Sequence, residues 1–331
     1  MKILILTNNP SRASFRLRIA AHLDYLRQQG ITSEVHVMSS SLRERWRLFK
    51  SSSAYDAILI HRKCLNFWDA QVLFHYAPTR IFDFDDAIMH SPACPDSDHT
   101  SHYRLFRRTA KKMDVMVAGN PTLADYARRY CKKAIVLPTG LDTTAYLKPK
   151  AAPKDGKIRF VWIGSKSTVK YLSQLKPVFE QIGKTHRNVV LRIIADEFFD
   201  LNNMEVEKRP WSVQTEVADL LACDVGLSPL PNDRFARGKC GFKMLQYFAA
   251  GLPVIASPVG VNETFIHESQ AGVLAATSQQ WIEAIEHLIA NLNHWQQRGE
   301  EGRKYVRSFD VSVIGEKLCD IIKSTVAGSV R

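Results

Sequence analysis

The segment RGKCGFKMLQYFAAGLPVIASPVGVNETFI, residues 237–266, combines residue types that bind an anion. It places a glycine-bearing loop directly before a predicted helix over residues 241–250. The N-terminus of a helix presents unpaired N–H groups and the positive end of the helix dipole, so it favours a negatively charged ligand. The segment therefore predicts an anion site at the start of this helix.

Two lysines and a glutamine surround that helix start. Lys243 lies in the first turn, where the dipole disfavours a cation unless an anion such as a diphosphate is bound. Lys239 precedes it in the loop and Gln246 follows it on the helix, so all three side chains can face the same space. Alternatively, both lysines are solvated side chains of a surface loop, because lysine is the residue type most often exposed.

A second loop offers further groups for a phosphate. Gly164 ends a predicted buried strand over residues 157–164. Ser165, Ser167 and Thr168 follow it and supply hydroxyl groups where a phosphate would lie. We therefore predict that this loop contributes to the same anion site.

Three carboxylates end another predicted strand. Asp83, Asp85 and Asp86 stand in IFDFDDAIMH, and close packing of like charges should raise the pKa of at least one of them. Such a group could bind an acceptor or take a proton from its hydroxyl. A helix cap or another structural role is the first alternative, and a divalent metal ion is the second.

Arginines occupy the stretch after the first predicted strand. NNPSRASFRLR, residues 8–18, carries Arg12, Arg16 and Arg18. Arginine can donate two parallel hydrogen bonds to a phosphate or carboxylate, so Arg12 and Arg16 are candidates to bind an anionic acceptor or a diphosphate. The alternative is that they are exposed residues at the start of a helix.

The elements that must position these residues alternate between short apolar runs and longer helical patterns, which indicates parallel sheets with crossover helices. The predicted strands are 2–7, 32–38, 57–62, 80–85, 114–119, 134–138, 157–164, 188–195, 224–230, 253–257 and 272–276. The predicted helices include 16–30, 169–183, 212–223, 241–250, 278–292 and 310–326. The predicted fold class is α/β, with two Rossmann-like domains facing across a cleft where ligands meet the carboxyl ends of strands.

Three segments resemble family-4 glycosyltransferases, the glycosyl transferases group 1, which have the GT-B fold. FKMLQYFAAGLPVIASPVGVNETF, residues 242–265, is similar to the donor-site segment of that family. IVLPTGLDTTAY, residues 135–146, is similar to its linker, and WIGSKSTVKYLSQL, residues 162–175, to its phosphate-binding loop and helix. The three segments keep the order and spacing of the family.

The resemblance implies an enzyme that transfers a sugar from a nucleotide-diphosphate donor to a saccharide or lipid-linked acceptor, with retention at the anomeric carbon. It makes Lys170 the phosphate-binding lysine, and it makes Gly241 and Phe242 contacts to the donor. Lys170, Lys243 and the helix N-terminus would meet the negative charge that develops on the leaving diphosphate. Because lysines meet this charge, we expect neither a metal nor a cofactor besides the donor.

The resemblance also implies the domain organisation. Residues 1–150 form the acceptor domain and residues 151–308 form the nucleotide-sugar domain. The proline- and glycine-rich segment 137–157 is the predicted linker. The last helix, within residues 309–331, is expected to pack back toward the first domain.

The donor helix departs from the family pattern at two positions. The family usually carries two glutamates separated by seven residues, and those positions are Gly238 and Gln246 here. Gln246 can accept a hydrogen bond from a ribose hydroxyl, but it supplies no charge. A sugar-nucleotide-binding protein without catalytic activity is therefore one alternative function, and a nucleic-acid-associated sugar transferase, suggested by the basic composition, is another.

The net charge of +12 is concentrated in the first half of the chain. Residues 1–155 contain 24 Lys+Arg against 14 Asp+Glu, and the remainder contains 21 against 19. The basic stretches 42–50 and 104–112 suit an anionic membrane surface, but they could also be solvated helix faces. No motif for nucleic acid accompanies the charge, so we do not expect nucleic acid as a partner.

The remaining sequence features concern location. The N-terminal run MKILILTNNP is too short for a signal-peptide core, and no stretch reaches the roughly 18 apolar residues of a membrane span. The 6 cysteines show no CxxC spacing, which indicates reduced thiols rather than a zinc site or disulfides. We expect a cytoplasmic protein that could bind the inner face of a membrane, with a role in envelope or polysaccharide synthesis.

Overall fold

The computed structural model describes residues 1–91, 93–147 and 155–329, and the chain divides into two compact units. The first unit consists of Met1–Leu141, Asp233–Cys240 and the chain from Phe309 onward. The second unit consists of Asp142–Asn232 and Gly241–Ser308. The expected domain boundary between residues 150 and 151 lies outside the described residues. Residues 233–240, which the sequence places in the second domain, pack with the first unit.

A parallel six-stranded sheet forms the centre of the first unit, in the order β2-β1-β3-β4-β5-β6. Its strands are β1 (Lys2–Thr7), β2 (Thr32–Val37), β3 (Ala57–His61), β4 (Arg80–Phe84), β5 (Val115–Ala118) and β6 (Ala134–Val136). Its helices are α1 (Ala13–Arg18), α2 (Leu23–Gln28), α3 (Leu42–Lys50), α4 (Phe67–Tyr76), α5 (Ser101–Ala110), α6 (Pro121–Arg128), α10 (Arg234–Arg237) and α15 (Val311–Ser329). Leu4 and Leu6 belong to one apolar core and Ile3 and Ile5 to another, so both faces of β1 are covered, as its unbroken apolar run predicts.

A second parallel six-stranded sheet forms the centre of the second unit, in the order β12-β11-β10-β7-β8-β9. Its strands are β7 (Ile158–Ile163), β8 (Val189–Ala195), β9 (Glu205–Pro210), β10 (Val225–Ser228), β11 (Val254–Ala256) and β12 (Gly272–Leu274). Its helices are α7 (Lys166–Ser173), α8 (Lys176–Thr185), α9 (Glu216–Leu221), α11 (Phe242–Ala249), α12 (Val261–Ser269), α13 (Ser278–Ala290) and α14 (Leu292–Val306). The α/β class with two Rossmann-like parallel sheets is therefore confirmed.

The strand orders fix where each sheet can bind a ligand. In the first sheet the chain goes from β1 outward to β2 and then back to β3 on the other side of β1. In the second sheet it goes from β7 to β8 and β9, and then back to β10 on the other side of β7. Connections at such a switch point leave in opposite directions and open a crevice at the carboxyl ends of the two strands. We therefore expect ligands to bind at the carboxyl ends of β1 and β3 in the first sheet, and of β7 and β10 in the second.

Two predicted helices are interrupted. The expected helix 16–30 is divided into α1 and α2, with a 3₁₀ turn at Ala20–His22 between them. Arg18, the last residue of α1, is buried just before this break. The expected helix 169–183 is α7 and α8, because Pro177 stands at the start of α8, where its missing N–H costs no helical hydrogen bond.

Three elements of the second unit do not follow from the apolar pattern. β9 is an edge strand of sequence EVEKRP with mostly exposed side chains, so it lacks the apolar run of a central strand. α14 is rich in polar residues and packs closely through glycines: a Cβ at Gly299 would lie 2.1 Å from the carbonyl oxygen of Gly251. α12 starts after Gly260, which has a φ of 59° that glycine adopts readily.

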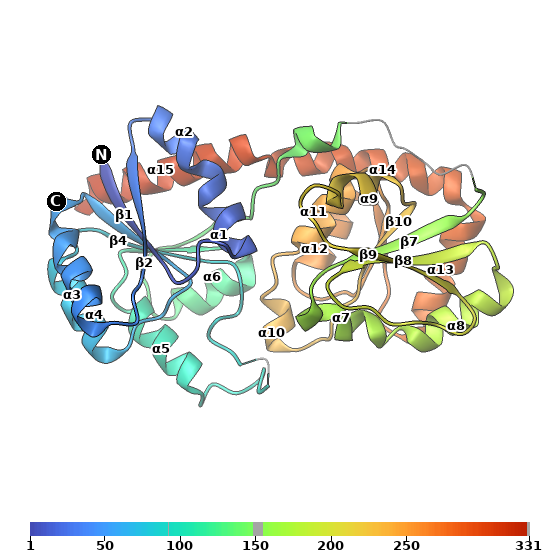
Figure 1. Ribbon diagram of the computed structural model, residues 1–331, viewed down its shortest axis with the longest axis horizontal. Coiled ribbons are helices and arrows are strands. Elements are labelled where there is room, and N and C mark those ends of the chain that lie inside the picture. The colour runs from blue at the N-terminus through green and yellow to red at the C-terminus, as the bar shows by residue number, and fades with distance from the viewer. Residues whose placement is uncertain (92, 148–154, 330–331) are drawn as a thin grey trace. The chain divides into compact units, whose positions relative to one another are not determined.

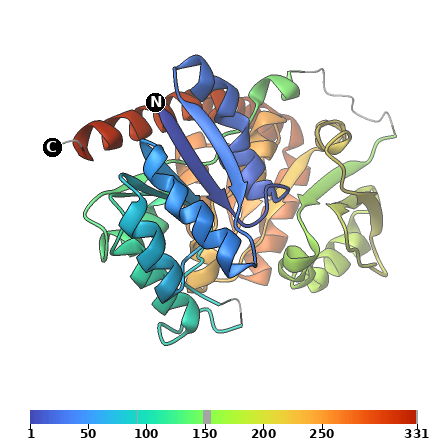
Figure 2. The same ribbon diagram turned by 60° about the vertical axis from the view of Figure 1, so that its left-hand side comes forward.

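The C-terminal helix α15 belongs to the core of the first unit. Ile314, Leu318 and Ile322 are almost wholly buried and share an apolar cluster with Ile3 and Ile5 of β1. Figures 1 and 2 both show this red helix running beside the blue N-terminal elements. The first sheet thus obtains part of its cover from the last residues of the chain.

This packing predicts the effect of one substitution. Leu318→Ala should lower the free energy of unfolding of the first unit by about 2–5 kcal/mol, because it leaves a cavity among buried side chains. Lys317→Ala, at the exposed neighbouring position, should change it by about 0.5 kcal/mol or less. Urea denaturation followed by circular dichroism measures both values. Equal values for the two variants would show that α15 does not stabilise this unit.

Candidate active site

A buried tyrosine fixes helix α11 at the switch point of the second sheet. The Ile163 amide donates to the Tyr247 hydroxyl oxygen at 3.0 Å, and that hydroxyl donates to the Leu227 carbonyl at 3.1 Å. Ile163 ends β7 and Leu227 belongs to β10, so one side chain of α11 joins both central strands. The helix predicted to bind an anion is thereby held at the carboxyl ends of β7 and β10.

The ring of Trp162 brings the two predicted phosphate-binding segments together. A Cβ at Gly164 would lie 2.3 Å from this ring, so only glycine fits at that position of the loop. The Nζ of Lys243 lies 4.4 Å from the centroid of the same ring, a cation–π contact. Gly164 and Lys243 are far apart in sequence, and both lie against one side chain of the second unit.

The start of α11 has no side-chain cap among the described residues. Its N-cap is Gly241, with a φ of 64°, which a glycine adopts without strain. A Cβ at Gly241 would lie 2.8 Å from Val261 and 2.9 Å from Phe265, both of α12. The first-turn amides of α11, beginning at the half-buried Phe242, are therefore not covered by a capping side chain of their own helix.

A second glycine-headed helix, missed in the sequence analysis, starts beside α11. α12 follows Gly260 and also lacks a side-chain cap among the residues described. Asn262 in its first turn donates to the carbonyls of Ser228 and Ser257, each at 3.2 Å, which fixes α12 at the ends of β10 and β11. Gly260 and Val261 precede a stretch with acidic and aromatic residues, and this pattern could have predicted the start of α12.

Gln246 is buried and lies beside a carboxylate that the sequence analysis did not single out. Its side-chain amide donates to the Tyr146 hydroxyl at 3.4 Å and to the Glu216 carboxylate at 3.5 Å. Glu216 stands at the start of α9 and also accepts a hydrogen bond of 2.8 Å from the Trp211 ring. A negative charge therefore lies next to the position where the family pattern has its second glutamate.

The hydroxyls of the Gly164 loop are partly engaged with the loop itself. The Thr168 hydroxyl donates to the Ser165 carbonyl at 3.0 Å and accepts from the Ser165 amide at 3.2 Å. Lys170 is exposed on α7, with its Nζ 5.3 Å from the centroid of the Tyr171 ring. The loop is thus held in shape by its own hydrogen bonds, and Lys170 lies on the following helix.

Lys239 and Gly238 belong to the first unit, whereas Lys243 belongs to the second. The Nζ of Lys239 lies 3.6 Å from a carboxylate oxygen of Asp86. A Cβ at Gly238 would lie 2.7 Å from Ala87, and its carbonyl accepts a hydrogen bond of 2.9 Å from Asn120. The position where the family has its first glutamate therefore has no room for a side chain.

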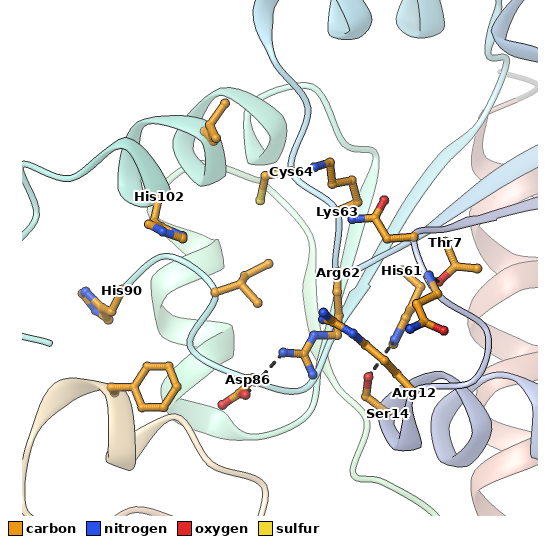
Figure 3. Close-up of a pocket in the computed structure, with 15 residues that line it drawn as sticks. Thr7, Arg12, Ser14, His61, Arg62, Lys63, Cys64, Asp86, His90 and His102 are labelled. Carbon is orange, nitrogen blue, oxygen red and sulfur yellow. Dashed lines mark hydrogen bonds and ion pairs between the residues drawn. The ribbon is translucent and has the colours of Figure 1, made fainter. Parts of the chain in front are cut away.

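The first unit contains a cavity of about 380 Å³ at its switch point. Residues that follow β1 line one side of it, and residues that follow β3 line another (Figure 3). The polar and charged residues of the lining are Thr7, Asn8, Asn9, Arg12, Ser14, His61, Arg62, Lys63, Asp86, His90 and His102. Of the predicted acceptor residues, Arg12 lines this cavity, whereas Arg16 is not among the lining residues.

A strained turn after β3 directs Arg62 toward two of the predicted carboxylates. Arg62 has a φ of 61°, in the left-handed region that residues with a side chain rarely adopt. The Lys63 amide donates to the His61 carbonyl at 2.8 Å and closes a three-residue turn around Arg62. The Arg62 guanidinium then lies 2.9 Å from Asp85 and 3.3 Å from Asp86.

A largely buried network adjoins the cavity. Arg18 forms an ion pair with Asp83, with both side chains about 1% exposed, and also donates to the Leu137 carbonyl at 2.9 Å. His61 Nδ1 lies 2.9 Å from Asp83, and His61 Nε2 lies 3.2 Å from the Ser14 hydroxyl. Burial alone would raise the pKa of Asp83, but the charge and hydrogen bonds of Arg18 and His61 lower it to about 2. Asp83 therefore orients His61 and, contrary to the expectation from sequence, is not exposed to an acceptor.

Asp85 and Asp86 differ in their surroundings. Burial raises the pKa of Asp85, and the nearby charge of Asp86 adds to this effect, whereas Arg62 opposes it. One of the three carboxylates thus has the raised pKa that the sequence predicts, although burial rather than mutual repulsion is the main cause. Asp86 lines the cavity, and Asp85 does not.

Comparison with known proteins finds one family model that is similar to part of the chain. The model of the glycosyl transferases group 1 family matches residues 147–291. The matched residues make up less than half of the chain and include most of the second unit. Two of the segments that resemble this family, residues 162–175 and 242–265, lie within the matched residues. A sequence search of curated proteins found no match.

Solved structures show the GT-B fold over nearly the whole chain. Sucrose-phosphate synthase from Thermosynechococcus elongatus is 14% identical, with a TM-score of 0.80 and 99% of each chain covered. HepE from Anabaena, solved with UDP, is 17% identical, with a TM-score of 0.73 over 98% of this chain and 100% of its own. WaaG, a glycosyltransferase involved in lipopolysaccharide biosynthesis, is 14% identical, with a TM-score of 0.70 over 97% and 99%.

The basic stretches of the chain are amphipathic helices whose apolar sides pack against the core. Phe49 of α3 is buried and Trp46 packs against the same core, while Leu42 stays 49% exposed. On α5, Phe106 is buried and Arg107 is exposed. None of the helices in the described part of the chain has the length and hydropathy of a membrane span. Among the described residues, no cluster of three or more His, Cys, Asp or Glu side chains is arranged to hold a metal ion. Binding to an anionic membrane surface stays a prediction.

The buried ion pair predicts a large effect of a small change. Asp83→Asn should lower the free energy of unfolding by about 3–5 kcal/mol, because it leaves the Arg18 charge buried without a partner. Asp114→Asn, which affects a half-exposed pair with Arg80, should cost about 1 kcal/mol or less. Urea denaturation at pH 7 compares them.

The pH dependence gives a second readout of the same pair. The carboxylate of Asp83 should contribute its full stability above the ordinary aspartate pKa of about 3.9, and this contribution should be lost as the pH falls toward 2. If Asp83→Asn and Asp114→Asn lowered the free energy of unfolding equally at pH 7, the stabilising role assigned to the Arg18–Asp83 pair would be contradicted.

Proposed function

We propose that the second unit binds a nucleotide-diphosphate sugar and that the first unit binds the acceptor, a saccharide or a lipid-linked saccharide. The observation that carries this proposal is the contact of Gly164 and Lys243 with one ring, Trp162, at the switch point of the second sheet. The HepE structures contain UDP and UDP-glucose, which supports UDP-glucose as the first donor to test.

The diphosphate of the donor binds at the start of α11. The first-turn amides after Gly241 and the ammonium group of Lys243 provide positive charge there, and Lys170 adds a cation from α7. When the bond between the anomeric carbon and the diphosphate breaks, negative charge grows on the leaving oxygen. Donors that are already fixed in place stabilise this charge without reorganisation, which lowers the barrier.

The ribose of the nucleotide binds beside Gln246. The Gln246 amide can exchange hydrogen bonds with a ribose hydroxyl, and the adjacent Glu216 carboxylate supplies the negative charge that Gln246 lacks. Glu216 thereby offsets the departure from the family pattern in the donor helix.

The acceptor hydroxyl attacks the anomeric carbon on the same face from which the diphosphate leaves, which gives the retention of configuration that the resemblance implies. A bond forms between the acceptor oxygen and the anomeric carbon, the bond to the diphosphate breaks, and the acceptor proton is taken up by Asp86, which lines the cavity. Asp85 and Asp83 serve as positioning residues, since Asp85 holds Arg62 and Asp83 holds His61.

The donor site predicts the effect of removing one lysine. Lys243→Ala should weaken UDP binding by about 10- to 100-fold, because a hydrogen bond to a charged group contributes about 1.5–3 kcal/mol. Lys184→Ala, which removes an exposed lysine from α8 of the same unit, serves as the control and should leave the affinity unchanged. Isothermal titration calorimetry measures both, with circular dichroism to verify the fold.

One result of the UDP titrations would contradict the proposed donor site. A folded Lys243→Ala variant that binds UDP as tightly as the parent protein would show that the diphosphate does not bind at the start of α11. Transfer of labelled glucose from UDP-glucose to an acceptor would then have to depend on a donor site elsewhere in the protein.

A further inference from the structure

We infer that β2, at the edge of the first sheet, pairs antiparallel with β2 of a second copy of the chain and joins two first sheets into one continuous sheet. The partner is thus a second molecule of the same protein, and the surface is the outer edge of Thr32–Val37. The residues that line the cavity of the first unit and those proposed to bind the donor do not belong to β2. The inference therefore does not rest on the proposed function.

The outer edge of β2 presents unpaired backbone groups. The Thr32 amide donates to the Met1 carbonyl at 2.8 Å, on the side of β1. Because the N–H and C=O groups of successive residues point to alternate sides of a strand, those of Ser33, Val35 and Val37 point away from β1. In the described part of the chain, no turn or loop forms a backbone hydrogen bond with these groups. A second strand can therefore add to this edge.

The other edges of the two sheets are short or protected. β6 and β12 are each 3 residues long, which leaves little backbone for pairing. In β9 the Trp211 amide donates to the Ala195 carbonyl of β8 at 3.0 Å, so the outward positions are Val206, Lys208 and Pro210. Proline has no N–H, and lysine is a charge that protects natural sheet edges. β2, with the sequence TSEVHV, carries neither.

The sequence of β2 is complementary to itself in one register. Pairing centred on Val35 places this residue opposite Val35 of the second copy and places Glu34 opposite His36 of the second copy. Glu34 and His36 then form a non-hydrogen-bonded pair of the ladder, where facing side chains lie closest, and an imidazole N–H meets a carboxylate. The two neighbouring registers place Glu34 opposite Glu34 or His36 opposite His36, and both lose this match.

The Glu34 carboxylate is held in position for such a contact. It accepts a hydrogen bond from the Tyr55 hydroxyl and lies 2.9 Å from the Nζ of Lys2. These contacts leave the Glu34 side chain 41% exposed, and the His36 side chain is 45% exposed. Within one chain the two groups are 3.9 Å apart, so His36 is not in hydrogen-bond contact with its own Glu34.

The other face of β2 offers apolar side chains. Val35 and Val37 are 36% and 51% exposed, although valine favours the half-buried surface of a sheet. In the inferred pairing Val35 contacts its own copy, and Val37 lies opposite Ser33 of the second copy. Removal of this apolar surface from water adds to the backbone hydrogen bonds in favouring the dimer.

Sedimentation velocity of the whole protein tests the association. The parent protein should be mostly dimeric at about 100 μM. Val35→Pro removes an outward N–H and no bond to β1, so the dissociation constant should rise at least about tenfold while circular dichroism stays unchanged. Lys208→Pro, the same change at an outward position of β9, is the control and should leave the dissociation constant unchanged.

Substitutions that keep every backbone bond provide a second measurement. Val35→Lys places two ammonium groups opposite each other and should weaken the dimer at least about tenfold, whereas Val213→Lys, at an exposed valine of the second unit, should not. His36→Glu should also weaken it, because the new carboxylate faces Glu34 of the second copy. Glu34→His combined with His36→Glu should recover part of the affinity, because the facing groups are complementary again.

Cysteine substitutions test the register. They are made together with Cys94→Ser, which removes an exposed cysteine. Oxidised glutathione should convert Val35→Cys into a disulfide-linked dimer, because directly opposite Cα atoms of a hydrogen-bonded pair lie about 5.5 Å apart, within the range of a disulfide. Val37→Cys should stay unlinked, because the same pairing separates the two copies of residue 37 by four residues along the strand, roughly 13 Å. Non-reducing gel electrophoresis compares the two.

Three results would each overturn the inference. They are a monomeric parent protein at about 100 μM, a dimer that neither Val35→Pro nor Val35→Lys weakens, and a disulfide that forms in Val37→Cys but not in Val35→Cys. The donor proposal is tested separately by the UDP titrations of Lys243→Ala, so either proposal can fail while the other stands.

Discussion

The position of the first strand within each sheet is the constraint on which the sites depend. Because β1 and β7 lie inside their sheets, the chain must leave each of them in one direction and return on the other side. The carboxyl ends of β1 and β3, and of β7 and β10, are thus free of a crossing connection and become binding surfaces. Gly164, the start of α11 and the cavity beside His61 all lie at such ends.

The buried pair of Arg18 and Asp83 serves the first site indirectly. Burying two charges is costly, and a well-packed apolar pair could often replace them without loss of stability. In this protein the pair does more than hold the fold, because Asp83 also fixes the ring of His61 and thereby the hydroxyl of Ser14 at the cavity. Arg18 further joins the end of α1 to the residue that follows β6, because it donates to the Leu137 carbonyl.

The sequence predicts what local patterns determine. The apolar runs of β1, β3 and β4 identify central strands, and the glycine loop before Phe242 identifies the start of α11. Contacts between distant residues leave no local pattern, so the pairing of Lys239 with Asp86 and the approach of Glu216 to Gln246 could not be predicted. The functional interest of His61, Arg62 and Lys63 could have been predicted, since they lie at or directly after the carboxyl end of the predicted strand 57–62, as Asp83 to Asp86 do for the strand 80–85.

The central claim is that the amides at the start of α11 and Lys243 bind the diphosphate of the donor. A crystal structure of the protein soaked with UDP measures this directly. The account predicts phosphate oxygens about 2.7–3.2 Å from the backbone nitrogen of a first-turn residue of α11, with the Lys243 ammonium beside them. Electron density for UDP at any other place, with the start of α11 covered by protein side chains, would contradict it.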